Sequence, residues 1–174
     1  MNGKSLSSEL KEIITGAKRL YANYGKDLLS DLGFMKVLDD YEKAIEDTAR
    51  AMTSLSIWKM CAICGNSPKG SCCAPEVAIW YDAELVFVNL LMGCDVEKGQ
   101  FYKDHCFFLG KNGCILKARH YYCVHYLCPE IKAILSAAEL DMLYRTIGRE
   151  ILTGSNVLHY FEQWRKHHDG VIVA

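Results

Sequence analysis

The sequence predicts a mainly α protein, a helical domain wrapped around an irregular, cysteine-rich insert with a short hairpin. Both ends of the chain repeat apolar residues at the spacing of one helix face. All nine cysteines and all three prolines fall instead in the middle of the chain, among turn-forming glycines and asparagines. We therefore expect one domain with N-terminal helices over 1–60, the cysteine-rich region over 61–129 and C-terminal helices over 130–174.

The first sixty residues are predicted to form two helices. One apolar pattern covers 10–24, with Ser7 or Ser8 as its cap and Gly25 as its stop. A longer pattern covers 38–55, and its other face is rich in acidic residues. We interpret that acidic face as exposed to solvent.

The middle of the chain contains one clear helix and one hairpin signal. Asp82 is a natural cap for a helix over 83–92, which Gly93 ends. Because this helix has almost no polar face, we expect it to be buried. Two short apolar runs within 107–116 flank Asn112-Gly113, a pattern typical of a β-hairpin.

The last part of the chain is predicted to be helical again. Pro129 suits the first turn of a helix, and an apolar pattern follows over 131–152. Gly154 is predicted to end that helix, and Ser155 to cap a final one. The tryptophans are expected in the core: Trp58, Trp80 and Trp164.

Charge and targeting signals limit the classes of partner that the sequence predicts. The net charge is −1, and acids and bases are balanced along the chain, so no nucleic-acid partner is predicted. The N-terminus lacks the apolar stretch of a signal peptide, and the apolar run 83–92 is too short to span a membrane. We expect a cytoplasmic protein with no membrane partner. In a reducing compartment, clustered cysteines favour metal binding over disulfides, which stay an alternative.

The cysteine spacing indicates sulfur chemistry. Cys61 and Cys64 are two residues apart and precede Gly65, as in a metal-binding knuckle formed by a tight turn. Such a pair also suits redox chemistry, although a redox pair normally opens a helix after a strand. Adjacent Cys72 and Cys73 cannot easily pair with each other. Eight cysteines suit two four-coordinate zinc sites or one iron–sulfur cluster with spare thiols, which leaves Cys94 as a bystander.

The other residues around the cysteines do not distinguish zinc from an iron–sulfur cluster. Aromatic residues such as Phe107 and Tyr122 surround them, as around many iron–sulfur clusters, whereas Cys64-Gly65 is equally typical of zinc. Arg119 is expected either to lie beside the metal centre, where a cation offsets thiolate charge, or to form a surface salt bridge. The nearby histidines are expected to be exposed or hydrogen-bonded rather than ligands: His105, His120 and His125.

At this point the chain resembles a known family. CAICGNSPKGSCC, followed by HCFFLGKNGCILKARHYYCVHYLC, is similar to the YkgJ-type cysteine-cluster family, described as a zinc- or iron-chelating domain. Arg119 matches the family's arginine, whereas His120 stands where the family has proline. The gap from Cys64 to Cys72 is longer than usual. The resemblance implies metal ligation by eight residues: Cys61, Cys64, Cys72, Cys73, Cys106, Cys114, Cys123 and Cys128.

Three kinds of function fit this sequence. The first is a metal-binding cysteine-cluster protein, with an iron–sulfur cluster or zinc and an unassigned biochemical role. The second is a protein-modifying enzyme, since lysine methylases resembling this family carry such a cluster. No glycine-rich nucleotide loop supports it, and a motif does not transfer a reaction. The third is a metal-stapled interaction module with a protein partner. The sequence leaves open whether the protein is an enzyme.

Overall fold

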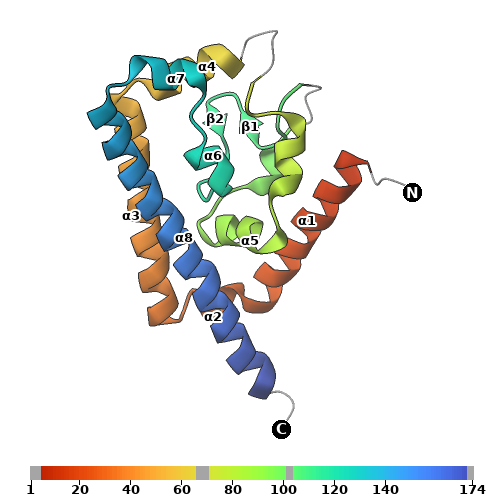
Figure 1. Cartoon of the computed structure of the whole chain (residues 1–174). Helices are drawn as coiled ribbons and strands as arrows, with labels where there is room; N and C mark the ends of the chain where they lie inside the picture. The colour runs from red at the N-terminus through yellow and green to blue at the C-terminus, as the bar shows by residue number, and fades with distance from the viewer. Residues whose placement is uncertain (1–4, 66–70, 101–103, 172–174) are drawn as a thin grey trace.

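The described residues are mostly helical, as predicted. This computed structural model describes residues 5–65, 71–100 and 104–171. In Figure 1, α3 (Leu32–Ser54) and α8 (Ala137–Val171) lie side by side in opposite directions, and α1 (Leu6–Leu20) forms the other flank. The short elements of the cysteine-rich region lie between these flanks. The helices thus enclose the insert from two sides.

The N-terminal helix differs from the prediction at both ends. Its cap is Ser5, whose side chain accepts a hydrogen bond from the backbone N–H of Ser8. After α1 the chain continues as a π-helix, Tyr21–Gly25, and as α2, Lys26–Leu28. Gly25 therefore does not stop the helix. It is buried, and a Cβ there would lie 3.1 Å from the Tyr21 ring, so close packing explains the glycine.

The long helix α3 begins at a partly buried side-chain contact with α8. Asp31 caps α3 by accepting a hydrogen bond from the backbone N–H of Phe34 at 2.7 Å. The hydroxyl of Tyr160 on α8 donates to the same Asp31 oxygen at 2.8 Å. After α3, Ser56 adopts a left-handed backbone with φ of 56°, and α4 (Ile57–Gly65) follows in a new direction. The predicted helix over 38–55 is thus confirmed, with an earlier start.

The middle of the chain contains the predicted buried helix and hairpin. Asp82 caps α5 (Ala83–Leu91), whose residues 86–89 are buried. Strands β1 (Leu109–Gly110) and β2 (Gly113–Cys114) pair antiparallel, with Leu109 opposite Cys114. The remaining elements are the 3₁₀ helices Pro75–Trp80 and Val96–Lys98, α6 (Tyr121–His125) and α7 (Pro129–Ile134).

The predicted break at Gly154 is wrong, because α8 runs through it without interruption. Gly154 faces Tyr41 of α3, and a Cβ at this position would lie 2.8 Å from the Tyr41 ring. Tyr41 is only 3% exposed, so its ring has little room to move away. Gly154 therefore permits close packing of α3 on α8, and Ser155 caps no new helix.

Gly154→Ala should destabilise the protein by about 1–3 kcal/mol, because the added methyl overpacks the contact with Tyr41. Gly148 lies on the same helix, and a Cβ added there would meet no neighbouring segment within 4 Å. Gly148→Ala should instead stabilise by up to about 1 kcal/mol through helix propensity. Urea unfolding measures both changes. Equal stabilisation by the two substitutions would contradict the packing role of Gly154.

Two clusters of buried side chains hold the fold together. The main cluster joins α1, α5 and the insert to both long helices, with Phe34, Phe87 and Phe161 among its largest members. The second cluster joins Ile57 of α4 and Ile131 of α7 to α6 and the first half of α8. The second cluster therefore fixes the ends of the segments that carry the first and last cysteines.

The prediction that all three tryptophans lie in the core is correct only for Trp164, which is 8% exposed. Trp58 is 53% exposed and Trp80 is 44% exposed. Trp80 packs edge-on against Tyr122, with ring centroids 4.9 Å apart, at the surface of the insert. Aromatic rings therefore cover the outside of the cysteine-rich region as well as its interior.

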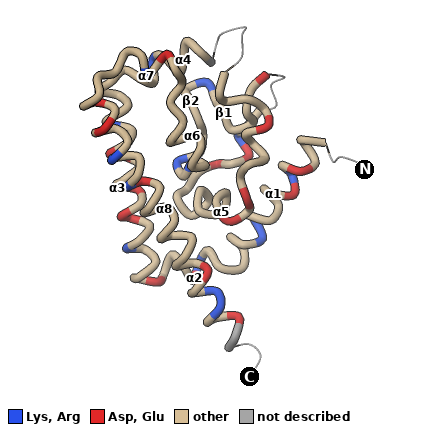
Figure 2. The backbone as a smooth tube through the Cα atoms, in the orientation of Figure 1, with Lys and Arg blue, Asp and Glu red and all other residues tan. Residues whose placement is uncertain are grey.

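Charged residues of both signs are interspersed along the helices in Figure 2. On α3 the acidic residues are largely paired within the helix, for example Lys36 with Asp40 at 2.9 Å. The acidic face predicted for this helix is thus a solvated face with its own counter-charges. Of the helices in the described ranges, none combines the length and the apolar character needed to cross a bilayer.

Candidate metal centre

The eight predicted ligands are contributed by separate segments of the insert and its borders. All nine cysteines are free thiols. Cys61 and Cys64 lie on α4, so the tight turn predicted for them is wrong. In a helix, residues three apart share one face, which still directs both thiols the same way. The other six lie before the 3₁₀ helix Pro75–Trp80, on and around the hairpin, on α6 and at the cap of α7: Cys72, Cys73, Cys106, Cys114, Cys123 and Cys128.

Four of these thiols form what we call the first thiol group: Cys61, Cys64, Cys72 and Cys128. Burial raises the pKa of Cys61, and the charges of Cys72 and Cys128 raise it further. Burial likewise raises the pKa of Cys64, again followed by the charges of the same two thiols. The charges of Cys72 and Cys128 thus act on both thiols of α4.

The other four form the second thiol group: Cys73, Cys106, Cys114 and Cys123. Burial raises the pKa of Cys106 to about 12, and the charges of Cys114 and Cys123 add to this effect. Burial is also the main cause of the raised pKa of Cys114, to which the charge of Cys123 contributes. Cys106 lies in the main core and Cys73 and Cys123 pack against it, whereas Cys128 of the first group packs against the second core.

Adjacent Cys72 and Cys73 link the two groups. A hydrogen bond between their thiols lowers the pKa of Cys72 and raises that of Cys73. The hydrogen bond and burial are the main causes of the raised pKa of Cys73, and the charges of Cys106 and Cys123 raise it further. Besides burial, Cys72 also raises the pKa of Cys123, so this pair is in electrostatic contact with thiols of both groups.

Solvent access differs between the thiols. Cys61, Cys72 and Cys114 are exposed residues, whereas Cys106 is only 5% exposed. Burial nevertheless dominates the pKa of Cys61 and Cys114, because many protein atoms surround each sulfur although the residue reaches the surface. Each group thus has an exposed member through which a metal could enter.

Hydrogen bonds hold the segments of the second group in place. The backbone N–H of Cys106 donates to the carbonyl of Cys73 at 2.7 Å, which joins two segments far apart in the sequence. The hydroxyl of Tyr81 donates to the Cys123 sulfur at 3.9 Å. Tyr81 is 3% exposed and was not expected at the site. The Tyr81 hydroxyl would therefore stabilise a thiolate at Cys123 by donating a hydrogen bond to it.

A buried asparagine fixes the segment that carries Arg119. The Asn89 amide of α5 donates to the carbonyl of Ala118 at 2.8 Å and accepts from the N–H of Ala118 at 3.0 Å. It also donates to the carbonyl of Leu85 on its own helix. Both Asn89 and Ala118 are fully buried. The main chain beside Arg119 is therefore tied to α5 by a polar contact inside the core.

Arg119 acts on both thiol groups. Burial is the main influence on the pKa of Cys61, Cys114 and Cys123 and raises it, and the positive charge of Arg119 opposes that rise. Cys61 belongs to the first group and the other two to the second. This proximity agrees with the expectation of a cation beside the cysteines, and its role toward a cofactor stays a prediction.

Other predicted neighbours occupy the edge of the site. Cys94 is partly buried against the main core, and its charge has a minor effect on the pKa of Cys114. His120 caps α6, where its ring nitrogen accepts a hydrogen bond from Tyr122 at 3.3 Å. The aromatic neighbours Phe101 and Tyr102 lie outside the described residues.

The cysteine sulfurs are donors that suit a soft metal, although their side chains are not arranged around a bound ion. Within residues 5–65, 71–100 and 104–171, no three cysteine, histidine, aspartate or glutamate side chains are already placed to hold one metal ion. Two sets of four thiols are the ligand sets that zinc and iron–sulfur clusters both take. Binding would require the side chains of each group to turn inward together.

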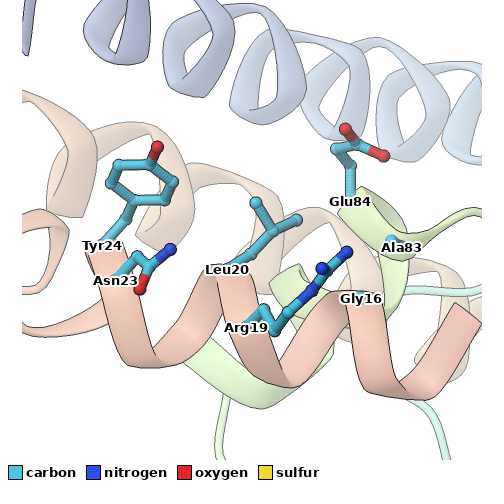
Figure 3. A pocket seen from close by; sticks show the side chains of 7 residues that line it. All are labelled: Gly16, Arg19, Leu20, Asn23, Tyr24, Ala83 and Glu84. Carbon is cyan, nitrogen blue, oxygen red and sulfur yellow. The ribbon is translucent and has the colours of Figure 1, made fainter. Parts of the chain in front are cut away.

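Two surface pockets lie elsewhere. One of about 320 Å³ lies between α1 and the start of α5, where Figure 3 shows Arg19 and Glu84 toward one end and Tyr24 at the other, with Leu20 between them. The other lies between α3 and α8, near Asp47 and Arg149. Neither is lined by a cysteine, so neither provides a substrate cleft at the thiols.

Comparison with models of protein families, with curated proteins and with solved structures finds no match to this chain. Functional inference therefore depends on the chemistry of the thiols and on the cysteine order itself.

Proposed function

We propose that the protein binds metal through two four-cysteine sites, one in each thiol group. The observation that carries this proposal is the gathering of the eight thiols in one region, where the charges of Cys72 and Cys128 act on both thiols of α4 and those of Cys114 and Cys123 act on Cys106. The similarity of the cysteine order to the YkgJ-type cysteine-cluster family supports it. The biochemical role beyond metal binding is not assigned by these observations.

Thiolates without a counter-charge are unfavourable in a protein interior. Burial disfavours their charged forms, and the charge of each thiolate disfavours ionisation of its neighbours. A bound cation reverses this balance, because it needs thiolates and neutralises much of their charge. Thiols with raised pKa values are protonated near neutral pH, so metal binding at these sites would release protons.

The two sites would tie the insert to the helical flanks. In the first site α4 and the start of α7 would share a metal with Cys72, and in the second the hairpin and α6 would share one with Cys73. When bound, a metal supplies folding free energy, and an iron–sulfur cluster would add electron transfer. The chain's own residues provide thiolates, the Tyr81 donor and the Arg119 charge.

Metal analysis of protein purified without oxygen tests this proposal. We expect two zinc ions per chain and a colourless sample, or iron with equivalent acid-labile sulfide and a brown sample. Two zinc ions, or enough iron and sulfide for two clusters, support two four-cysteine sites, and sulfide separates the two chemistries; metal for a single site contradicts the division. Protein that binds neither metal after anaerobic reconstitution, while remaining folded by circular dichroism, would contradict it.

A further inference from the structure

One buried carboxyl group lies in the packing of the two long helices. Glu150 shares the inward-facing stripe of α8 with three fully buried apolar residues: Leu143, Ile147 and Val157. Glu150 is 1% exposed, and neither of its carboxyl oxygens has a hydrogen-bond partner among the described residues. A negative charge without a partner is strongly disfavoured in such surroundings, so this carboxyl group is expected to be protonated while the helices are packed.

The facing side of α3 does not donate a hydrogen bond to this carboxyl group. Thr48 is fully buried, and its hydroxyl donates to a carbonyl of its own helix at 3.1 Å. Tyr41 is buried on the same helix, and its hydroxyl donates nothing to Glu150. Asp47 lies at the surface of the interface, where it pairs with Arg149 at 3.9 Å. The packed interface therefore suits a neutral group at Glu150 better than a charged one.

The other elements packed on α8 do not supply a partner either. Arg119, in the segment before α6, forms no ion pair with Glu150 among the described residues. His125 of α6 packs on Tyr144, more than one turn earlier in α8. Burial raises the pKa of Glu150, and the smaller opposite effects of Thr48 and Arg119 do not cancel this rise. The direction of the pKa agrees with what the burial and the missing hydrogen bonds indicate.

The α3–α8 pair also carries three of the four thiols of the first thiol group. The chain passes from α3 into α4, which bears Cys61 and Cys64, and from Cys128 through α7 into α8. Figure 1 shows α4 and α7 at the same end of the pair. The second thiol group lies on the insert instead. A change in the packing of α3 on α8 would therefore reach the first thiol group before the second.

We propose that Glu150 makes the α3–α8 interface pH-sensitive, so that ionisation of its carboxyl group loosens the two helices and the segments that they carry. The neutral group keeps the helices packed, whereas the carboxylate needs water, and the helices open locally to admit it. Because the pKa in the packed state is raised above the ordinary value of 4.5, the stabilisation is complete below that pH. It is lost as the pH rises through the raised pKa. This inference goes beyond metal binding and does not need a bound metal.

Amide hydrogen exchange measured by mass spectrometry tests the proposal, with the wild type and Glu150→Gln compared at the same pH. The readout is the ratio of their exchange rates in α3, α4, α7 and α8. This ratio should rise by about 10-fold or more between about pH 5 and about pH 8, because one linked proton shifts an opening equilibrium by up to about 10-fold per pH unit. The strands Leu109–Gly110 and Gly113–Cys114 should exchange alike in both proteins.

Two further variants complete the test. Glu150→Met fills a similar volume without a titratable group and should behave as Glu150→Gln does. Glu162→Gln is the matched control, because Glu162 lies exposed on the same helix and pairs with Lys166 at 2.8 Å, and it should exchange as the wild type does. A ratio that does not change with pH, or a change that extends equally to α1 and the hairpin, would overturn the inference. Either result leaves the metal analysis to decide the proposed function separately.

Discussion

Replacement of Cys61 by serine is expected to remove one of two metal sites and to leave the other loaded. Cys61 belongs to the first thiol group, and serine oxygen is a poor ligand for the soft metals that thiolates select. Cys106→Ser should do the same to the second group. Metal content per chain should fall by half in each variant and to nearly none in the double variant.

Cys94→Ser is the matched control for both substitutions. Cys94 is partly buried like several of the predicted ligands, yet it belongs to neither thiol group. Its replacement should leave the metal content unchanged. Complete metal loss from Cys61→Ser alone, in protein that stays folded, would show that the eight thiols form one centre and would contradict the division into two.

Asn89→Ala is expected to lower the free energy of unfolding by about 2–5 kcal/mol. The substitution leaves the N–H and the carbonyl of buried Ala118 without their partners, and each unsatisfied buried group costs about 1–3 kcal/mol. The loss should also free the segment beside Arg119. Urea unfolding followed by circular dichroism measures the change in stability.

The matched control for this prediction is Asn156→Ala. Asn156 is exposed on α8, and a surface substitution of this kind should change the free energy of unfolding by no more than about 0.5 kcal/mol. A loss below about 1 kcal/mol in Asn89→Ala would mean that water or a local shift satisfies Ala118. Asn89 would then not be the residue that fixes the Arg119 segment.

Local patterns were enough to predict the elements whose causes are local. Asp82 and the apolar run after it define α5, and Asn112-Gly113 defines the hairpin. Gly25 and Gly154 were misinterpreted, because a glycine that ends a helix and one that admits a neighbouring ring look alike in a sequence. Only the packed structure distinguishes the two, because Gly25 meets Tyr21 one turn earlier and Gly154 meets Tyr41 far along the chain.

The site was predictable in its residue types and not in its arrangement. Spacing identified eight thiols, but their division depends on how α4, the hairpin and α6 pack together. Glu150, which is 1% exposed, could have been expected to be buried, because it falls within the apolar pattern of α8 beside Ile147 and Ile151. Asn89 similarly interrupts an otherwise apolar helix. In both helices, a polar residue within an otherwise apolar pattern is the sequence signal for a buried polar side chain, and the prediction did not use it.

Native mass spectrometry of the anaerobically purified chain tests the central claim most directly, because it counts bound metal and released thiol protons together. We predict a mass increase for two metal ions or two clusters, with eight thiol protons lost and Cys94 alone open to alkylation. A chain that carries one metal site, or eight thiols that all react with the alkylating reagent in the folded protein, would contradict the claim.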